Sequence, residues 1–188
     1  MATQEELNNM ILAAARFGDV DTLQYGINKG AEVNCQDHNG QTPLHTTAMD
    51  GRTDIVDLLL RSAASPSVVN NDGMTPLHFA AETGNTELVD LLLKSGASPS
   101  VVDNEGQTPL HFAAETFNTE LVDLLLKAGG SASVVDNVGQ TPLHRAAMTG
   151  NTEIVDHLLR SGASPSVVDN DVINPSAKLR ESNIKLLK

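Results

Sequence analysis

The tetrapeptide Thr-Pro-Leu-His recurs at a fixed interval and constrains this chain more than any other feature of its sequence. It begins at Thr42, Thr75, Thr108 and Thr141, so each copy starts 33 residues after the preceding one. Such a period is typical of stacked helical repeats, in which each repeat buries its apolar face against its neighbours. The chain is therefore predicted to form a stack that grows in one dimension, without one central core.

Each copy predicts two short helices joined by a tight loop. In the second copy, Thr75 can cap the first helix, Pro76 fits its first position, and Gly84 suits the left-handed residue that ends it. Asn85 can cap the second helix, in which apolar residues return at helical spacing. The following segment, 98–106, predicts an extended stretch and a tight turn.

Counting in steps of 33 gives the repeat boundaries within a single domain spanning residues 1–188. The regular repeats are 38–70, 71–103, 104–136 and 137–169. Residues 5–37 form a degenerate N-terminal capping repeat, with helices expected over 4–17 and 20–28. Residues 170–188 form a truncated C-terminal cap, with a last helix expected over 177–187. Repeats 71–103 and 104–136 differ at only six positions, which either recent duplication or deliberate design would produce.

These motifs and their spacing resemble the ankyrin-repeat family over almost the whole chain. The resemblance implies an all-α solenoid of stacked helix-turn-helix repeats with β-hairpin fingers. It also implies a non-catalytic module that binds a partner protein through the concave face formed by the fingertips and first helices. The alternative is a designed or idealised scaffold with no native partner. A regulatory module cut from a larger enzyme or channel fits less well, because both ends resemble caps.

The candidate partner-binding residues occupy variable positions of the fingers, the first helices and the loops that follow them. They are His38, Gln41, Met49, Asp72, Met74, Phe79, Glu82, Glu105, Phe112, Glu115, Phe117, Val138, Arg145 and Met148. Phe79 and Phe112 hold the same position in adjacent repeats, so they could form a central apolar anchor with carboxylates around it. The alternative is that both rings simply pack between helices.

The chain is strongly acidic. It contains 24 Asp and Glu residues against 12 Lys and Arg residues, a formal net charge of -12. Such a chain repels phosphate backbones, so nucleic acid is not expected as a partner. A partner protein with a basic surface would complement this charge; the alternative is that the acidity only keeps the chain soluble.

Cys35 is the only cysteine, which excludes an intrachain disulfide and fits a reducing compartment. The N-terminal segment is acidic where a signal peptide would be basic, and no apolar run is long enough to span a membrane. We therefore expect a soluble, cytoplasmic protein with no membrane partner. It is expected to be a monomer, with weak self-association as an open alternative.

Four histidines recur with the tetrapeptide, at His45, His78, His111 and His144. Helices of adjacent repeats pack about 8 to 10 Å apart, whereas the ligands of one zinc ion lie about 2 Å from it. These imidazoles are therefore not expected to share a metal. The family resemblance implies instead that each histidine bonds the threonine of its own repeat and the neighbouring loop backbone. No nucleophile elbow, phosphate-binding loop or zinc-protease motif occurs, so neither catalysis nor a cofactor is expected.

Phe117 is the sharpest departure from the repeat pattern. It stands where the other repeats have Gly18, Gly51, Gly84 and Gly150. If its repeat kept the geometry of the others, a bulky left-handed residue would cost about 1 to 2 kcal/mol. We therefore expect either a compensating interaction or a reshaped loop. Three explanations are open: sequence drift tolerated by a stable stack, an engineered substitution, or a surface aromatic residue that contacts a partner or a second copy of the chain.

Overall fold

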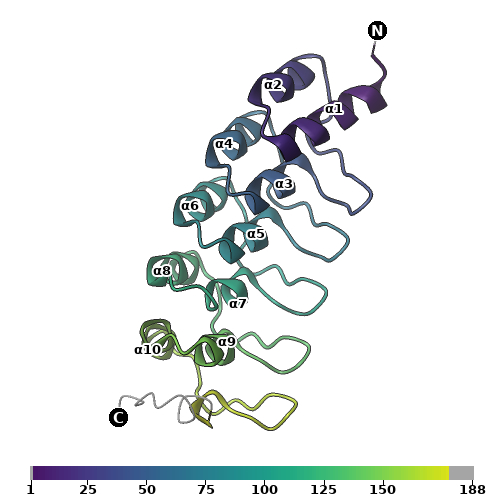
Figure 1. The fold of residues 1–188 in the computed structure, drawn as a ribbon. Helices are drawn as coiled ribbons and strands as arrows, with labels where there is room; N and C mark the ends of the chain where they lie inside the picture. Colours follow the sequence, from purple (N-terminus) through teal and green to yellow (C-terminus); the bar gives the residue numbers. More distant parts are fainter. Residues whose placement is uncertain (1, 178–188) are drawn as a thin grey trace. The chain divides into compact units, whose positions relative to one another are not determined.

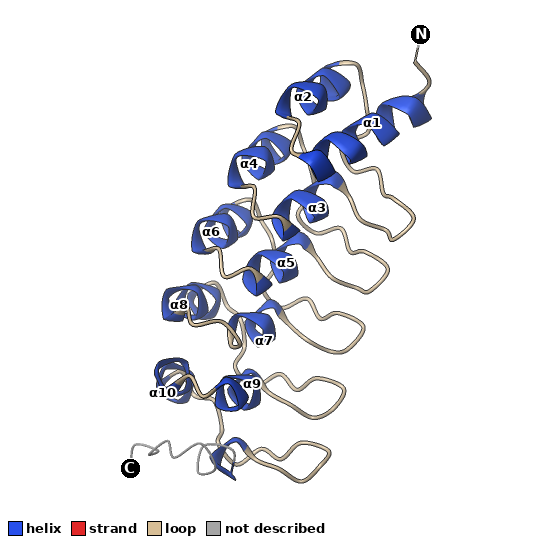
Figure 2. Ribbon diagram, viewed as in Figure 1, coloured by secondary structure: helices blue, strands red, loops and turns tan. Residues whose placement is uncertain are grey.

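The computed structural model describes residues 2–177. Within that range it contains ten α-helices in repeated pairs, a further helical stretch at 175–177, and no β-strand (Figure 1, Figure 2). This arrangement confirms the predicted all-α repeat fold. The chain divides into two compact units, residues 1–98 (unit 1) and 99–188 (unit 2). Apart from its first position, the last helix expected over 177–187 lies outside the described residues.

The helices follow the repeats. Those of unit 1 are α1 (Gln4–Phe17), α2 (Val20–Asn28), α3 (Pro43–Met49), α4 (Thr53–Arg61), α5 (Pro76–Glu82) and α6 (Thr86–Lys94). Those of unit 2 are α7 (Pro109–Ala113), α8 (Thr119–Lys127), α9 (Pro142–Thr149) and α10 (Thr152–Arg160). In unit 1, α1 packs on α2 and α3, α3 on α4 and α5, and α6 on α4 and α5. In unit 2, α7 packs on α8 and α9, and α10 on α8 and α9.

Local side-chain chemistry starts these helices where the sequence predicts them. The Thr42 side chain accepts a hydrogen bond from the backbone of His45, and the Thr42 backbone N–H donates to Nδ1 of His45 at 3.1 Å. Two backbone donors at the start of α3 are thus satisfied reciprocally. Asn85 begins α6 in the simpler way, because its side chain accepts from the Leu88 N–H at 3.1 Å.

The segments before the first helices are tight turns with extended flanks, the fingers of the fold. In the first finger, Gly40 donates to the Asp37 carbonyl and Asp37 donates to the Gln41 carbonyl, each at 2.9 Å. The Asp37 carboxylate also accepts from the Asn39 and Gln41 backbones. These bonds close the turn without forming a strand ladder long enough to count as β-structure, so the fingers appear as loops in Figure 2.

Each unit has its own apolar core between the two layers of helices. In unit 1 it includes Ile11, Leu44, Leu59, Leu77 and Leu92, each at most 2% exposed. The corresponding fully buried residues of unit 2 are Leu110, Leu121, Leu125, Leu143 and Ile154. Alanines on the first helices, such as Ala80 and Ala81, are also fully buried and allow close packing of neighbouring helices.

The loop around Phe117 is reshaped, which is one of the two outcomes expected for this residue, and Phe117 does not adopt the left-handed conformation of the glycines. Gly84 and Gly150 end or follow their helices with φ of 72° and 73°, whereas Phe117 is not among the described residues with positive φ. Helix α7 instead ends at Ala113, after only five residues. Thr116 then caps the shortened helix, because its hydroxyl donates to the Ala113 carbonyl at 2.7 Å. Early termination of α7 thus avoids the strain of a left-handed aromatic residue.

Candidate functional site

In unit 1 the two fingers are joined by an asparagine. The Asn71 N–H donates to the Asn39 carbonyl at 3.0 Å, and its side-chain amide donates to the His38 carbonyl at 3.1 Å. A Cβ atom on Gly40 would lie 2.9 Å from the Asn71 nitrogen, so only glycine permits this approach. The same bonds recur in unit 2, where Asn137 N–H donates to the Glu105 carbonyl at 2.8 Å. Sequence reasoning did not identify this role, although Asn71, Asn104, Asn137 and Asn170 recur at the repeat period.

The finger face of unit 1 is defined here by the predicted residues His38, Gln41, Met49, Asp72, Met74 and Glu82. His38 and Asp72 are exposed at the fingertips, and Gln41 and Met74 are half-buried where the fingers join α3 and α5. Met49 and Glu82 are exposed at the far, C-terminal ends of the same helices. The structure therefore spreads these residues from the fingertips to the helix ends and does not gather them into one pocket.

Phe79 does not belong to this exposed face. Its side chain is only 7% exposed, and its ring meets the His45 ring edge-on at a centroid distance of 6.2 Å. The packing interpretation is therefore correct for Phe79, and its assignment as an accessible anchor is wrong. Phe112, at the same position in the next repeat, is half-buried and keeps some accessible surface.

The finger face of unit 2 is defined by the predicted residues Glu105, Phe112, Val138 and Arg145. Glu105 and Val138 are exposed at the two fingertips, with Val138 51% exposed. The side chain of Arg145 is only 20% exposed, because its guanidinium donates to Glu115 at 2.9 Å and to Asp136 at 2.8 Å. This cation already bridges two carboxylates of its own unit, and its role as a partner contact stays a prediction.

Two further predicted residues, Glu115 and Phe117, lie on the loop that follows α7, and a third, Met148, lies in the last turn of α9. Phe117 is 79% exposed and Met148 is 58% exposed. The Asn151 side-chain amide donates to the Thr116 carbonyl at 3.2 Å, so the two loops are directly bonded to each other. The structure thus brings these residues to the ends of the first helices opposite the fingers.

The four repeated histidines serve the scaffold. Nε2 of His45 lies 3.1 Å from the Met74 carbonyl, and the same atom of His111 lies 3.1 Å from the Gln140 carbonyl. Burial lowers the pKa of His45 to about 4 and also lowers the pKa of His111. The rings of His45 and His111 therefore each link the threonine of their own repeat to the next finger, as the family resemblance implies. Among the described residues, no three His, Cys, Asp or Glu side chains are placed to hold a metal ion.

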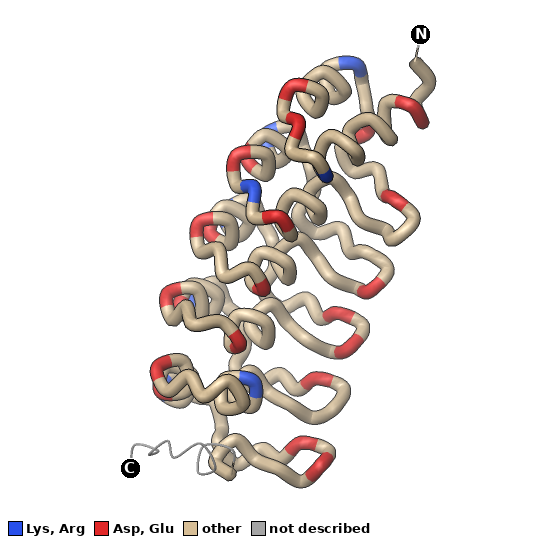
Figure 3. The backbone as a smooth tube through the Cα atoms, in the orientation of Figure 1, with Lys and Arg blue, Asp and Glu red and all other residues tan. Residues whose placement is uncertain are grey.

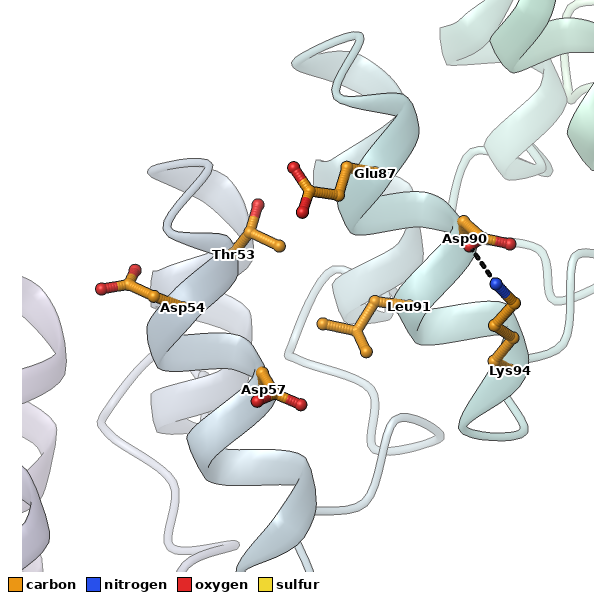
Figure 4. Close-up of a pocket in the computed structure, with 7 residues that line it drawn as sticks. All are labelled: Thr53, Asp54, Asp57, Glu87, Asp90, Leu91 and Lys94. Carbon is orange, nitrogen blue, oxygen red and sulfur yellow. Dashed lines mark hydrogen bonds and ion pairs between the residues drawn. The ribbon is translucent and has the colours of Figure 1, made fainter.

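A groove runs between the second helices α4 and α6 of unit 1 (Figure 4). Carboxylates line both walls, from Asp54 and Asp57 on α4 and from Glu87 and Asp90 on α6, with Leu91 between the two helices. Lys94 pairs with Asp90 at 2.5 Å within α6. Figure 3 shows that Asp and Glu also mark the fingers and second helices in both units. The sequence predicted the overall acidity but not this groove.

No helix within residues 2–177 combines the length and the apolar character that crossing a membrane requires.

Local stretches of the chain are similar to parts of larger proteins. The 60 kDa lysophospholipase of Mus musculus is 44% identical over 55 residues, which are 29% of this chain and 10% of that protein. The 2-5A-dependent ribonuclease of Mus musculus is 43% identical over 65 residues, 34% of this chain and 9% of that protein. The ankyrin repeat protein nuc-2 of Neurospora crassa is 38% identical over 55 residues, 29% of this chain and 5% of that protein.

Each match therefore spans a tenth or less of these relatives, and the activities in their names are not thereby assigned to this chain. A family model described as ankyrin repeats (3 copies) matches residues 10–103 and 95–169. These two matches together extend over most of the chain and include all four Thr-Pro-Leu-His copies. The chain belongs to the ankyrin-repeat family.

Proposed function

We propose that this chain is a non-catalytic protein-binding module that uses its finger faces, as ankyrin repeats generally do. The observation that carries this proposal is that some finger-region side chains hold the scaffold together while others stay exposed to solvent. Histidine and asparagine side chains join the fingers to one another, while His38, Asp72 and Glu105 remain exposed at the tips. Exposed side chains on a preorganised backbone suit recognition, because little conformational entropy is lost on binding.

We further propose that the partner presents a basic surface to these faces. Among the exposed predicted residues, Asp72, Glu82 and Glu105 are carboxylates, whereas Arg145 is already paired with Glu115 and Asp136. Complementary charge would speed association and select against acidic partners. A nucleic-acid partner is disfavoured by the same charge. Cytoplasmic location stays a prediction that rests on the single cysteine, the acidic N-terminal segment and the lack of a long apolar run in the sequence.

The test is affinity capture from a native lysate with charge-swapped forms of the full chain. Asp72→Lys with Glu82→Lys changes the finger face of unit 1, and Asp57→Lys with Asp90→Lys makes the same change in charge in the α4–α6 groove. The proposal expects the first pair to abolish capture of a saturable partner and the second pair to retain it. Equal loss from both pairs would mean that net charge alone governs binding. Absence of any saturable partner would contradict the proposal.

A further inference from the structure

A second surface of unit 2 is the edge formed by the last turn of α9, the loops after α7 and α9, and the helix starts that follow them. We call this the unit 2 rim and define it by five residues: Glu115, Phe117, Glu120, Met148 and Glu153. Phe117 and Met148 expose 79% and 58% of their surfaces, and Glu120 and Glu153 are exposed in the first turns of α8 and α10. The bond from Asn151 to the Thr116 carbonyl, at 3.2 Å, holds the two loops of the rim together.

No internal role accounts for the aromatic ring at Phe117. The side chain is more exposed than any other large apolar residue that the structure describes, so it contributes little to the core. The loop has been rebuilt around it, with α7 shortened to end at Ala113. Glu120 and Glu153 do have an ordinary explanation, because carboxylates in the first turn of a helix interact favourably with its dipole. That explanation does not extend to Phe117 or Met148.

The charges around the two apolar side chains are carboxylates, apart from the Arg145 cation that pairs with Glu115. Within residues 99–177 the cations are Lys127, Arg145 and Arg160, and each is in an ion pair. Lys127 and Arg160 lie in the last turns of α8 and α10, at the opposite ends from the rim. Arg145 reaches Glu115 but pairs with neither Glu120 nor Glu153. The rim therefore combines two apolar anchors with carboxylates that can attract a cationic ligand.

We propose that the unit 2 rim binds a segment of a partner protein in which apolar side chains are flanked by Lys or Arg. This rests on the proposed protein-binding function but places a second contact away from the finger faces. The apolar side chains would cover Phe117 and Met148 and exclude water from them, while the cations would pair with Glu120 and Glu153. A second copy of the chain is a poorer occupant, because it carries the same net charge of -12.

The probe is a synthetic peptide in which leucine and phenylalanine are flanked by lysines, titrated into the isotope-labelled full chain. A peptide of the same length with glutamates in place of the lysines is the control for charge. Binding is measured by fluorescence anisotropy and located by amide chemical-shift changes. The lysine peptide is expected to shift the rim amides and to bind more weakly as salt concentration rises, and the glutamate peptide is expected to do neither.

Substitutions distinguish binding at the rim from nonspecific binding to any exposed apolar side chain. Phe117→Ser with Met148→Thr should weaken peptide binding about tenfold or more, as removal of interface anchors does. Phe117→Gly, which restores the residue found in the other repeats, guards against misfolding of the first variant and should also weaken binding. Phe17→Ser is the matched control, because Phe17 is 77% exposed but lies in unit 1, at the end of α1 and directly after Arg16. It should leave binding unchanged.

Three results would overturn the proposal: no binding of the lysine peptide, equal loss from Phe17→Ser, or equal binding of the glutamate peptide. Peptide binding could instead be weakened by Asp72→Lys with Glu82→Lys and not by the rim variants. The peptide would then bind the finger face, which would contradict the rim proposal and leave the proposed finger-face function intact. Sedimentation velocity tests whether a second copy of the chain occupies the rim. A concentration-dependent dimer that disappears in Phe117→Ser would show that the rim binds a second copy instead.

Discussion

Arg145 and Asp136 form an ion pair at 2.8 Å in which the carboxylate side chain is only 1% exposed. The other Asp136 oxygen accepts from the Val138 and Gln140 backbones, so this pair fixes the finger of the last complete repeat to the start of α9. Two repeats earlier the same two positions hold Asn70, the last residue of repeat 38–70, and Phe79 of repeat 71–103, and the Asn70 side chain accepts the equivalent backbone bonds. The two repeats thus satisfy one geometry with different chemistry.

Replacement of Arg145 by phenylalanine is expected to lower the free energy of unfolding by about 1 to 3 kcal/mol, because it removes the cation from a buried carboxylate. Adding Asp136→Asn recreates the Asn70 and Phe79 combination and should restore most of the loss. Urea unfolding of the single and double variants measures both effects. If the second substitution gave no recovery, the buried charge would not be the cause of the instability.

The pH dependence of the unfolding free energy should reveal the protonation of buried histidines. The pKa of His45 is about 4 in the folded chain, against 6.5 for an ordinary histidine, mainly because of burial. The unfolded chain therefore binds more protons between these two values, and the unfolding free energy falls as pH decreases from 6.5 to 4. For His45 alone the fall is about 3 kcal/mol, and the stability is independent of this group above pH 6.5. The lowered pKa of His111 acts in the same direction.

His45→Gln isolates this contribution. Glutamine at that position keeps a Thr-x-x-Gln capping box with Thr42 but cannot be protonated in this range. Urea unfolding at several pH values should show a lower stability at pH 7, from loss of the bond to the Met74 carbonyl, and a shallower decline toward pH 4. A decline as steep as that of the unaltered chain would exclude His45 as its source.

The sequence predicted most of the helices because the chemistry that starts and ends them is local. Thr42 caps α3 and Asn85 caps α6 through side chains only three residues from their targets. The residues assigned to partner binding were harder to place, because their exposure depends on neighbouring repeats. Phe79 is covered by stacking, and Arg145 is engaged by Glu115 of the preceding repeat and by Asp136 of the finger. Residue spacing alone does not show which variable positions remain accessible after stacking.

Two residues other than glycine adopt left-handed backbone conformations in the described part of the chain: Ala63, with φ of 68°, and Val172, with φ of 60°. The matching positions in neighbouring repeats hold Gly96 and Gly139. Val172→Gly should stabilise the chain by about 1 kcal/mol, because a β-branched side chain is strained there. Ala63→Gly should stabilise it by less, since alanine is smaller and glycine has the greater entropy in the unfolded chain. Thermal unfolding measures both changes.

Gly139→Val is the reverse control within unit 2. Its Cβ atom would lie 3.1 Å from the Asn170 nitrogen at a φ of 81°, so both strain and crowding oppose it. This variant should lower the melting temperature by more than Val172→Gly raises it. A Val172→Gly variant that melted below the unaltered chain would mean that Val172 makes a compensating contact.

The last prediction concerns the stability of the loop at Phe117. If Phe117 were a strained left-handed residue, Phe117→Gly would stabilise the chain by about 1 to 2 kcal/mol. The reshaped loop removes that expectation, because the residue does not have positive φ and α7 ends early at Ala113. We therefore expect Phe117→Ala to change the unfolding free energy by less than about 0.5 kcal/mol, as is usual for an exposed position. Phe117→Gly should give no stabilisation beyond the same limit, because glycine also increases the entropy of the unfolded chain. Urea unfolding of both variants measures these values, and a gain of 1 kcal/mol or more in Phe117→Gly alone would show that the loop still carries strain which glycine relieves.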